Sequence, residues 1–175
     1  MLSIGEFSNI CKVSAKTLRY YAEIDVQLVE IAQLQLLSVR KLVQACDYPQ
    51  EYSQCFGRLF RRLASEQLTS AAPPMVLFHS SEFTPFGLDT EFAIPVKEYV
   101  TGTRIFHPGL CLKTTVNGDY SQLPAVYARH REWMEAEGYT YSSPLYEVYV
   151  TDPVNASSEQ ELITEVYSPI KKKHP

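Results

Sequence analysis

An internal duplication constrains the fold of this chain more than any other feature of the sequence. Four short segments of the first half recur in the second half, in the same order and at similar spacings. The matching pairs are residues 52–54 (YSQ) with 120–122 (YSQ), Pro74 with Pro144, Glu91 with Glu165, and Pro95 with Pro169. One short identity can arise by chance, but four in the same order predict that one structural unit occurs twice.

Each unit is predicted to fold as strand, helix, strand, strand, because its apolar residues switch between strand and helix spacing. The predicted strands are residues 38–44, 75–79 and 90–96 in the first unit and 110–116, 143–152 and 163–170 in the second, and the predicted helices run from 47 to 66 and from about 119 to 137. Residues 97–108 are expected to be a connector. We therefore predict an α+β fold of two β-α-β-β units about a pseudo-twofold axis, with both helices on one sheet face.

The strand at residues 143–152 carries the residue on which the functional prediction depends. Side chains alternate between the two faces of a strand. Tyr146, Val148 and Val150 therefore share one face, which suits burial, and Glu147 shares the other face with Tyr149. We predict that Glu147 is the centre of a ligand pocket; the alternative is a solvated glutamate on an exposed sheet face.

The same alternation assigns the side chains of the remaining strands to the two faces of the sheet. Phe92, Ile94 and Val96 are predicted to face the helices, and a groove between the halves is predicted on the helix-free face. The residues assigned to that helix-free face are Leu77, His79, Glu91, Ala93, Glu147, Tyr149, Glu165 and Tyr167. Glu91 and Glu165 are equally well explained as structural pairs, and Tyr149 and Tyr167 as ordinary packing.

The first 21 residues read as two short helices joined by a tight turn, which is the helix-turn-helix pattern. The second of these helices carries cationic, hydroxyl and phenolic side chains of the kind that contact DNA phosphates and base edges. They are Lys16, Thr17, Arg19, Tyr20 and Tyr21. The alternative is a generic pair of amphipathic helices with solvated charges.

Composition narrows the class of protein. A net charge of −4 argues against a globally basic nucleic-acid binder but allows a small basic DNA-binding segment. The four cysteines are widely spaced and form no CxxC pair, so reduced thiols and a cytoplasmic location are expected. The sequence contains no signal peptide, no membrane-spanning stretch, no metal-ligand spacing and no phosphate loop, so neither a membrane partner nor a metal or other cofactor is predicted.

The N-terminal segment IGEFSNICKVSAKTLRYYAEI closely resembles the opening of MerR-family transcription regulators, whose signature ends in TLRYY. The resemblance implies that Arg19, Tyr20 and Tyr21, with Lys16 and Thr17 ahead of them, contact promoter DNA, and that the protein is a homodimer. The family then carries a wing and a long dimerisation helix, whereas here only VQLVEIAQLQLL lies between Ile24 and the next unit. The expected domains are therefore a partial helix-turn-helix at 1–25, a linker at 26–37 and an effector-binding domain at 38–172.

The duplicated region, with Glu147 in the context YEVYVTDP, resembles the GyrI-like effector-binding domain, a pair of SHS2 units found in multidrug-sensing regulators. In that family a glutamate on the equivalent strand neutralises lipophilic cations inside an aromatic cage. The resemblance implies that Glu147, Tyr149 and Tyr120 line such a cage. The complete predicted ligand set is Glu147, Tyr149, Tyr167, Glu165, Tyr120, Glu91 and His79.

The predicted function is ligand-responsive transcriptional regulation with a lipophilic, cationic effector. An alternative follows from the same family, because some stand-alone members hydrolyse electrophilic small molecules with a pocket Glu and Tyr. In that case Glu147 would be the base, and Tyr149 or Tyr167 the acid.

Overall fold

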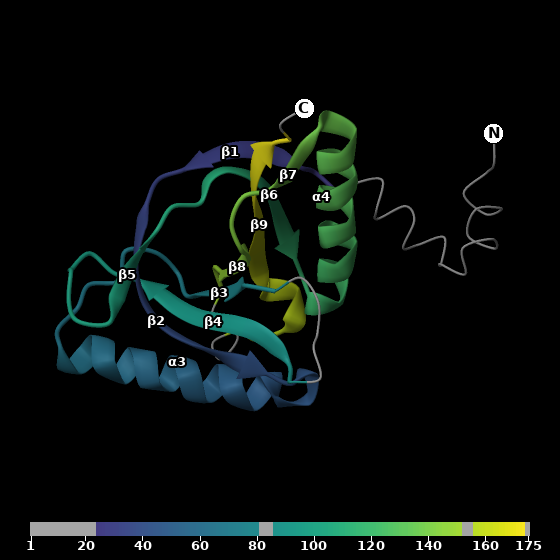
Figure 1. Ribbon diagram of the computed structural model, residues 1–175. Coiled ribbons are helices and arrows are strands. Elements are labelled where there is room, and N and C mark those ends of the chain that lie inside the picture. The colour runs from purple at the N-terminus through teal and green to yellow at the C-terminus, as the bar shows by residue number, and fades with distance from the viewer. Residues whose placement is uncertain (1–23, 81–85, 152–155, 174–175) are drawn as a thin grey trace.

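The computed structural model describes residues 24–80, 86–151 and 156–173. Within these ranges the chain forms one nine-stranded sheet with antiparallel ladders and two α-helices (Figure 1), which confirms the predicted α+β class. The predicted helix-turn-helix, including Lys16, Thr17, Arg19, Tyr20 and Tyr21, lies outside the described residues.

The two predicted units are both present. The first consists of β2 (Leu34–Val43), α3 (Tyr48–Ser65), β3 (Met75–Phe78) and β4 (Leu88–Pro95), and the second of β6 (Gly109–Asn117), α4 (Leu123–Glu137), β8 (Leu145–Tyr149) and β9 (Ile163–Lys172). Short 3₁₀ turns lie before both helices and before β9, at η1 (Ala45–Asp47), η2 (Tyr120–Gln122) and η3 (Glu159–Glu161). A short strand that was not predicted, β7 (Tyr139–Tyr141), follows α4 and pairs with β9.

The helix ends follow the local sequence. Pro49 and Pro124 each lie in a first turn, where the missing N–H group has no intrahelical partner to lose. α4 ends at Gly138, which adopts φ 74°, a left-handed conformation that favours glycine. These signals explain why both ends of α3 and the end of α4 were predicted within one residue, whereas α4 begins at Leu123, after η2, and not at the predicted 119.

The two units meet at the β3–β8 ladder in the middle of the sheet, whose strand order is β1-β6-β9-β8-β3-β4-β2-β5. In that ladder Val76 pairs with Glu147. Phe92 of β4 lies opposite Val76, and Val166 of β9 lies opposite Glu147. The duplication relates Phe92 to Val166, so the ladders relate Val76 to Glu147, and the predicted match of Pro74 with Pro144 was wrong by one residue. The pseudo-twofold axis therefore passes between these two residues.

Two further strands exchange between the units. β1 (Gln27–Ile31) precedes β2 in the chain but pairs with β6 of the second unit, and β5 (Thr103–Phe106) precedes β6 but pairs with β2 of the first. The expected linker at 26–37 and the expected connector at 97–108 are thus parts of the sheet. Each of these strands is short and pairs with the distant half of the chain, so neither local alternation nor a nearby partner indicated it.

The face prediction for Glu147 and Tyr149 was wrong, because both lie on the face that the helices cover. Glu147 is flanked in the sheet by Val76 and Val166, and Tyr149 packs in the same apolar cluster as Phe56 of α3. β8 is buried on both faces, since Tyr146 and Val148 on the opposite side are also buried. A strand buried on both faces shows the period of two but gives no sign of which face meets a helix.

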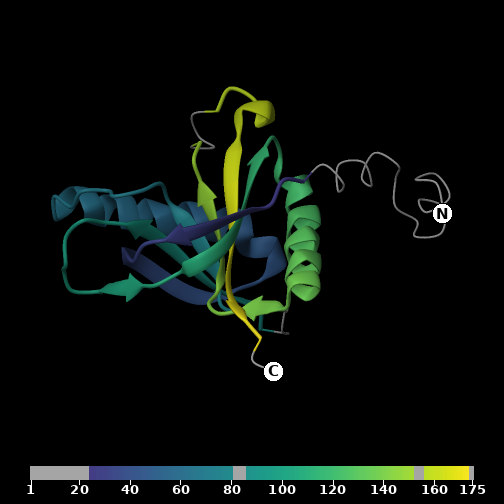
Figure 2. The same ribbon diagram turned by 90° about the horizontal axis from the view of Figure 1, so that it is seen from above.

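The helix-free face is filled by its own apolar cluster in place of the predicted groove. This cluster contains Leu77, Tyr146 and Tyr167, and residues of β1 and β5 pack against it, including Val29 and Phe106. In the view of Figure 2, β1, the edge strand that pairs with β6, is drawn across β9. The exchanged strands therefore provide the second cover of the sheet, and the helices provide the first.

Candidate ligand-binding site

The carboxylate of Glu147 lies at the centre of the sheet, below the space between α3 and α4. Its side chain is buried, with the residue 6% exposed, and its two oxygens accept hydrogen bonds from Tyr127 of α4 and from Tyr149, the latter at 2.7 Å. Burial raises the pKa of Glu147, and the two phenol hydrogen bonds offset this only in part. Among the described residues, no Lys, Arg or His forms an ion pair with Glu147.

An aromatic cleft of about 370 Å³ opens beside this carboxylate. It is lined by Tyr48, Pro49 and Tyr52 from α3, Tyr120 from η2, Leu123 from α4, and Glu147 and Tyr149 from β8. Tyr52 and Tyr120 both meet the Tyr149 ring edge-on, with ring centres 5.3 and 6.1 Å away and interplanar angles of 80° and 84°. The duplicated YSQ segments thus supply one tyrosine on each side of Tyr149.

A second cavity of about 350 Å³ lies against the same carboxylate. Its lining comes from β3 and the segment after it, β4, α4, β7 and β8, and consists of Phe78, Ser80, Leu88, Tyr127, Arg131, Tyr141, Leu145 and Glu147. Tyr127 is buried here, and burial followed by the nearby Glu147 charge raises its pKa well above the usual value. Glu147 is therefore shared between two cavities of similar size.

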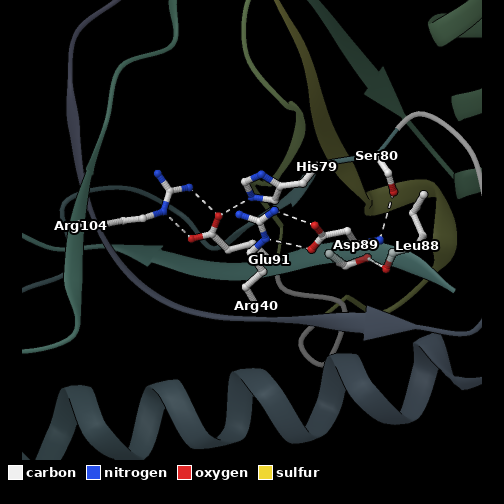
Figure 3. A network of polar contacts seen from close by, with 8 residues as sticks. Arg40, His79, Ser80, Leu88, Asp89, Glu91 and Arg104 are labelled. Carbon is white, nitrogen blue, oxygen red and sulfur yellow. Dashed lines mark hydrogen bonds and ion pairs between the residues drawn. The ribbon is translucent and has the colours of Figure 1, made fainter. Parts of the chain in front are cut away.

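Glu91 and His79 lie on the opposite, helix-free face. The Glu91 side chain is 2% exposed and accepts hydrogen bonds from Arg104 at 2.7 and 2.5 Å and from His79 at 2.7 Å (Figure 3). Burial raises the pKa of Glu91, but hydrogen bonds from Arg104, Ser38 and His79 outweigh it and lower the pKa to about 2. Glu91 is a charge already neutralised within the fold.

Glu165 and Tyr167 also lie on the helix-free face. Glu165 pairs with Lys113 at 2.6 Å and accepts a hydrogen bond from Tyr167 at 2.8 Å. The Tyr167 ring stacks on Tyr146, with centres 4.7 Å apart and planes 4° from parallel. These contacts fill the interior of this face, and they explain both residues as structural.

The seven predicted ligand residues therefore divide into two groups. Glu147, Tyr149 and Tyr120 come together at the cleft, whereas Glu91, His79, Glu165 and Tyr167 lie on the other side of the sheet. The sequence analysis missed Tyr48, Tyr52 and Tyr127 as lining residues. The repeat held a signal for Tyr52, because it occupies the same place in its YSQ segment as Tyr120.

Neither a metal centre nor a membrane span is seen in the part of the chain that the structure describes. In those ranges no three His, Cys, Asp or Glu side chains gather in a way that would hold a metal ion. No helix in them is both long and apolar enough to cross a bilayer.

Solved structures share this fold. The EcmrR chain in its DNA complex aligns with a TM-score of 0.73 and 19% identity over 97% of this chain and 66% of that one, so this chain spans just under two thirds of the EcmrR length. The EcmrR C-terminal domain aligns with a TM-score of 0.68 and 21% identity over 86% of this chain and 99% of that domain.

Two other relatives share the fold at lower similarity. A hydrolase from Listeria innocua has a TM-score of 0.60 and 15% identity, over 94% of this chain and 98% of that one. SAV2435 bound to tetraphenylphosphonium has a TM-score of 0.52 and 13% identity, over 85% of this chain and 94% of that one. At these identities the likeness extends to the fold alone.

No curated protein matches the chain. The family description that matches is the GyrI-like small molecule binding domain, which covers residues 24–171 and thus includes β1, both helices and the cleft at Glu147. This chain belongs to the GyrI-like family of small-molecule binding domains.

Proposed function

We propose that this domain is the effector-binding part of a ligand-responsive transcription regulator and that its ligand is a lipophilic organic cation. The observation that supports the cation is the environment of Glu147. Its carboxylate is buried between two cavities and has phenol donors as its partners, with no ion pair among the described residues. A buried carboxylate without a cationic partner is costly, and a bound cation removes that cost.

A comparison with the two other carboxylates predicted for the site, Glu91 and Glu165, supports the same choice. Arg104 neutralises Glu91, which also accepts a hydrogen bond from His79, and Lys113 neutralises Glu165. Glu147 differs from both because the fold supplies hydrogen bonds in place of a positive charge.

The aromatic cleft suits the rest of such a ligand. A delocalised organic cation offers few hydrogen bonds, and it gains about 0.5–2 kcal/mol for each aromatic face it contacts. Tyr48, Tyr52, Tyr120 and Tyr149 present aromatic rings around the cleft. SAV2435, which shares the fold, has been seen with tetraphenylphosphonium, a cation of this class.

The regulatory part of the proposal rests on the N-terminal segment and on EcmrR. We propose that residues 1–25 are a partial MerR-type reader in which Lys16, Thr17, Arg19, Tyr20 and Tyr21 contact promoter DNA. EcmrR, which aligns over nearly the whole of this chain, has been seen in a DNA complex. A homodimer and a cytoplasmic location belong to the same proposal, and the free thiols of Cys46, Cys55 and Cys111 fit a reducing compartment.

The test uses two ions of the same shape and opposite charge, tetraphenylphosphonium and tetraphenylborate. The protein is expected to bind the cation and to discriminate against the anion, and Glu147→Gln is expected to weaken cation binding by about 2–3 kcal/mol, because it removes one partner of a buried charge pair. Glu165→Gln, on the opposite face, is the control and leaves the affinity unchanged. Equal loss of both ions in Glu147→Gln would contradict the charge role.

A second candidate, hydrolysis of an electrophilic small molecule, is favoured by one specific feature of the site. The raised pKa of Glu147 suits a general base, and two phenols lie within hydrogen-bonding distance to act as the acid. Tyr149 is one of these phenols, whereas Tyr167 lies across the sheet. Incubation with reactive esters and strained cyclopropanes tests this candidate, because turnover lost in Glu147→Gln would favour a hydrolase over a sensor.

A further inference from the structure

We propose that the ligand is an extended zwitterion: a cationic aromatic part occupies the tyrosine cleft beside Glu147, and an anionic group reaches into the second cavity, where Arg131 binds it. This inference rests on the proposed cation-binding function and specifies the class of ligand further.

The two cavities differ in chemistry although they share Glu147. The tyrosine cleft contains no positively charged residue among its lining residues. The second cavity contains one, Arg131, together with the hydroxyl groups of Ser80 and Tyr141. A ligand that passes beside Glu147 therefore meets aromatic rings at one end and a guanidinium with hydroxyl groups at the other.

The position of Arg131 on α4 explains why it reaches this cavity. Arg131 follows Tyr127 by one helical turn, and residues four apart share a helix face. Tyr127 contacts Glu147 directly, so this face of α4 is directed at the site. Arg131 also lies near Tyr141 on the far side of the cavity, where its charge acts against the burial that raises the pKa of that phenol.

The charge of Arg131 is available to a ligand. Among the described residues, no carboxylate forms an ion pair with it, and it is not paired with Glu147 although both line the same cavity. Arg129, two residues earlier on the same helix, lies within 3.7 Å of Glu132 and is absent from the lining of either cavity. A guanidinium with a free planar fork favours a carboxylate or another oxyanion.

A matched pair of dyes tests this inference. Rhodamine 110 is a xanthylium cation with a free carboxylate, and rhodamine 123 is its methyl ester, so the two differ in the anionic group while keeping the cation. Binding is measured by fluorescence anisotropy with the full chain. The free acid is expected to bind about 3–5-fold more tightly than the ester, which is the range of a solvent-accessible ion pair.

The variants test the anion contact at Arg131 separately from the cation site at Glu147. Arg131→Gln is expected to remove the preference for the acid while the ester binds as before, and Arg129→Gln is expected to keep the preference. A preference that survives Arg131→Gln, or an ester that binds as tightly as the acid to the unaltered protein, overturns the zwitterion assignment while leaving the cation site intact. Unchanged binding of both dyes in Glu147→Gln overturns the cation site itself.

Discussion

Val76 and Glu147 pair directly across the central ladder and are also each other's counterparts in the duplicated fold. The axis that relates the two units thus has an apolar side chain on one side and a carboxylate on the other. Because only one of the two equivalent positions carries a charge, the symmetric framework holds an asymmetric site. One ligand with one cationic centre suits this arrangement better than two ligands.

Glu147→Gln is predicted to stabilise the ligand-free protein at neutral pH. The pKa of Glu147 is raised above its ordinary value of 4.5, mainly by burial. The stability contributed by such a group is fully present below pH 4.5 and is lost as the pH rises through the raised value. The amide does not titrate, so the variant should gain about 1–2 kcal/mol at pH 7–8, the usual gain when a strained functional residue is replaced.

Thermal unfolding of both proteins at pH 4 and pH 8 measures this difference. The two melting temperatures should converge at the lower pH. A variant that is less stable than the unaltered protein at pH 8 would contradict the unpaired state of Glu147.

Loss of Arg104 is predicted to be far more damaging than loss of Arg40, although both guanidinium groups contact carboxylates on neighbouring strand positions (Figure 3). The Glu91 side chain is 2% exposed and that of Asp89 is 29% exposed. Arg104→Gln removes the guanidinium that pairs with the buried carboxylate and leaves the hydrogen bond from His79, which should cost about 2–4 kcal/mol. Arg40→Gln should cost less than about 1 kcal/mol, because its ion pair is largely solvated.

Chemical denaturation of the two variants provides the comparison. The Glu91 pKa of about 2 predicts the pH dependence as well, because stability from this group is present above pH 4.5 and is lost as the pH falls towards 2. Equal losses in the two variants would show that Glu91 is not the buried, charged member of the network.

His130 is predicted to make the domain sensitive to mild acid. Its ring lies between Thr114 and Ser168 at 2.9 and 2.8 Å, is fully buried, and has a pKa lowered by burial from 6.5 to about 4. The stability that depends on the neutral ring is therefore present above pH 6.5 and is lost as the pH falls through about 4. Unfolding free energy should decline between pH 6.5 and 4, by about 1.4 kcal/mol for each pH unit at most.

His130→Gln keeps hydrogen-bonding capacity without a titrating ring and serves as the comparison. The variant should show a flatter stability profile between pH 6.5 and 4. A profile with the same slope as that of the unaltered protein would assign the acid sensitivity to other groups.

Tyr52 and Tyr120 are predicted to contribute equally to cation binding, because Tyr52 of α3 and Tyr120 of η2 each present a ring edge-on to Tyr149. Tyr52→Ala and Tyr120→Ala should each weaken tetraphenylphosphonium binding by about 1 kcal/mol, the typical value for one cation–π contact. Tyr→Phe at either position should retain most of the affinity, since the ring provides the attraction. Calorimetric titration checks the four variants, and a large loss in the Phe variants would show that the hydroxyl groups matter more than the rings.

The sequence was sufficient to predict the two units, both helices and the strand that carries Glu147, because these depend on local spacing and on the repeat. The sequence did not indicate which face of the sheet Glu147 lies on. The side chains of β8 are buried on both faces, so no exposed side distinguishes the face under the helices from the other. The exchange of β1 and β5 was equally hidden, since their partners lie in the other half of the chain. The contact of Tyr127 with Glu147 could not be predicted either, because it depends on how α4 lies over the sheet.

The exchange of β1 and β5 also determines how the cleft can open. The two halves of the sheet meet only at the β3–β8 ladder, but the chain also crosses between them through residues 32–33, from β1 to β2, and residues 107–108, from β5 to β6. These connections are too short to let the halves separate, so a hinge running between the halves is not available to this fold. α3 and α4, by contrast, rest on the sheet through side-chain packing, and the cleft lies between them. Entry of a bulky ligand therefore requires one of the two helices to tilt while the sheet stays in place. Such a tilt also moves the segments that join this helix to its neighbouring strands.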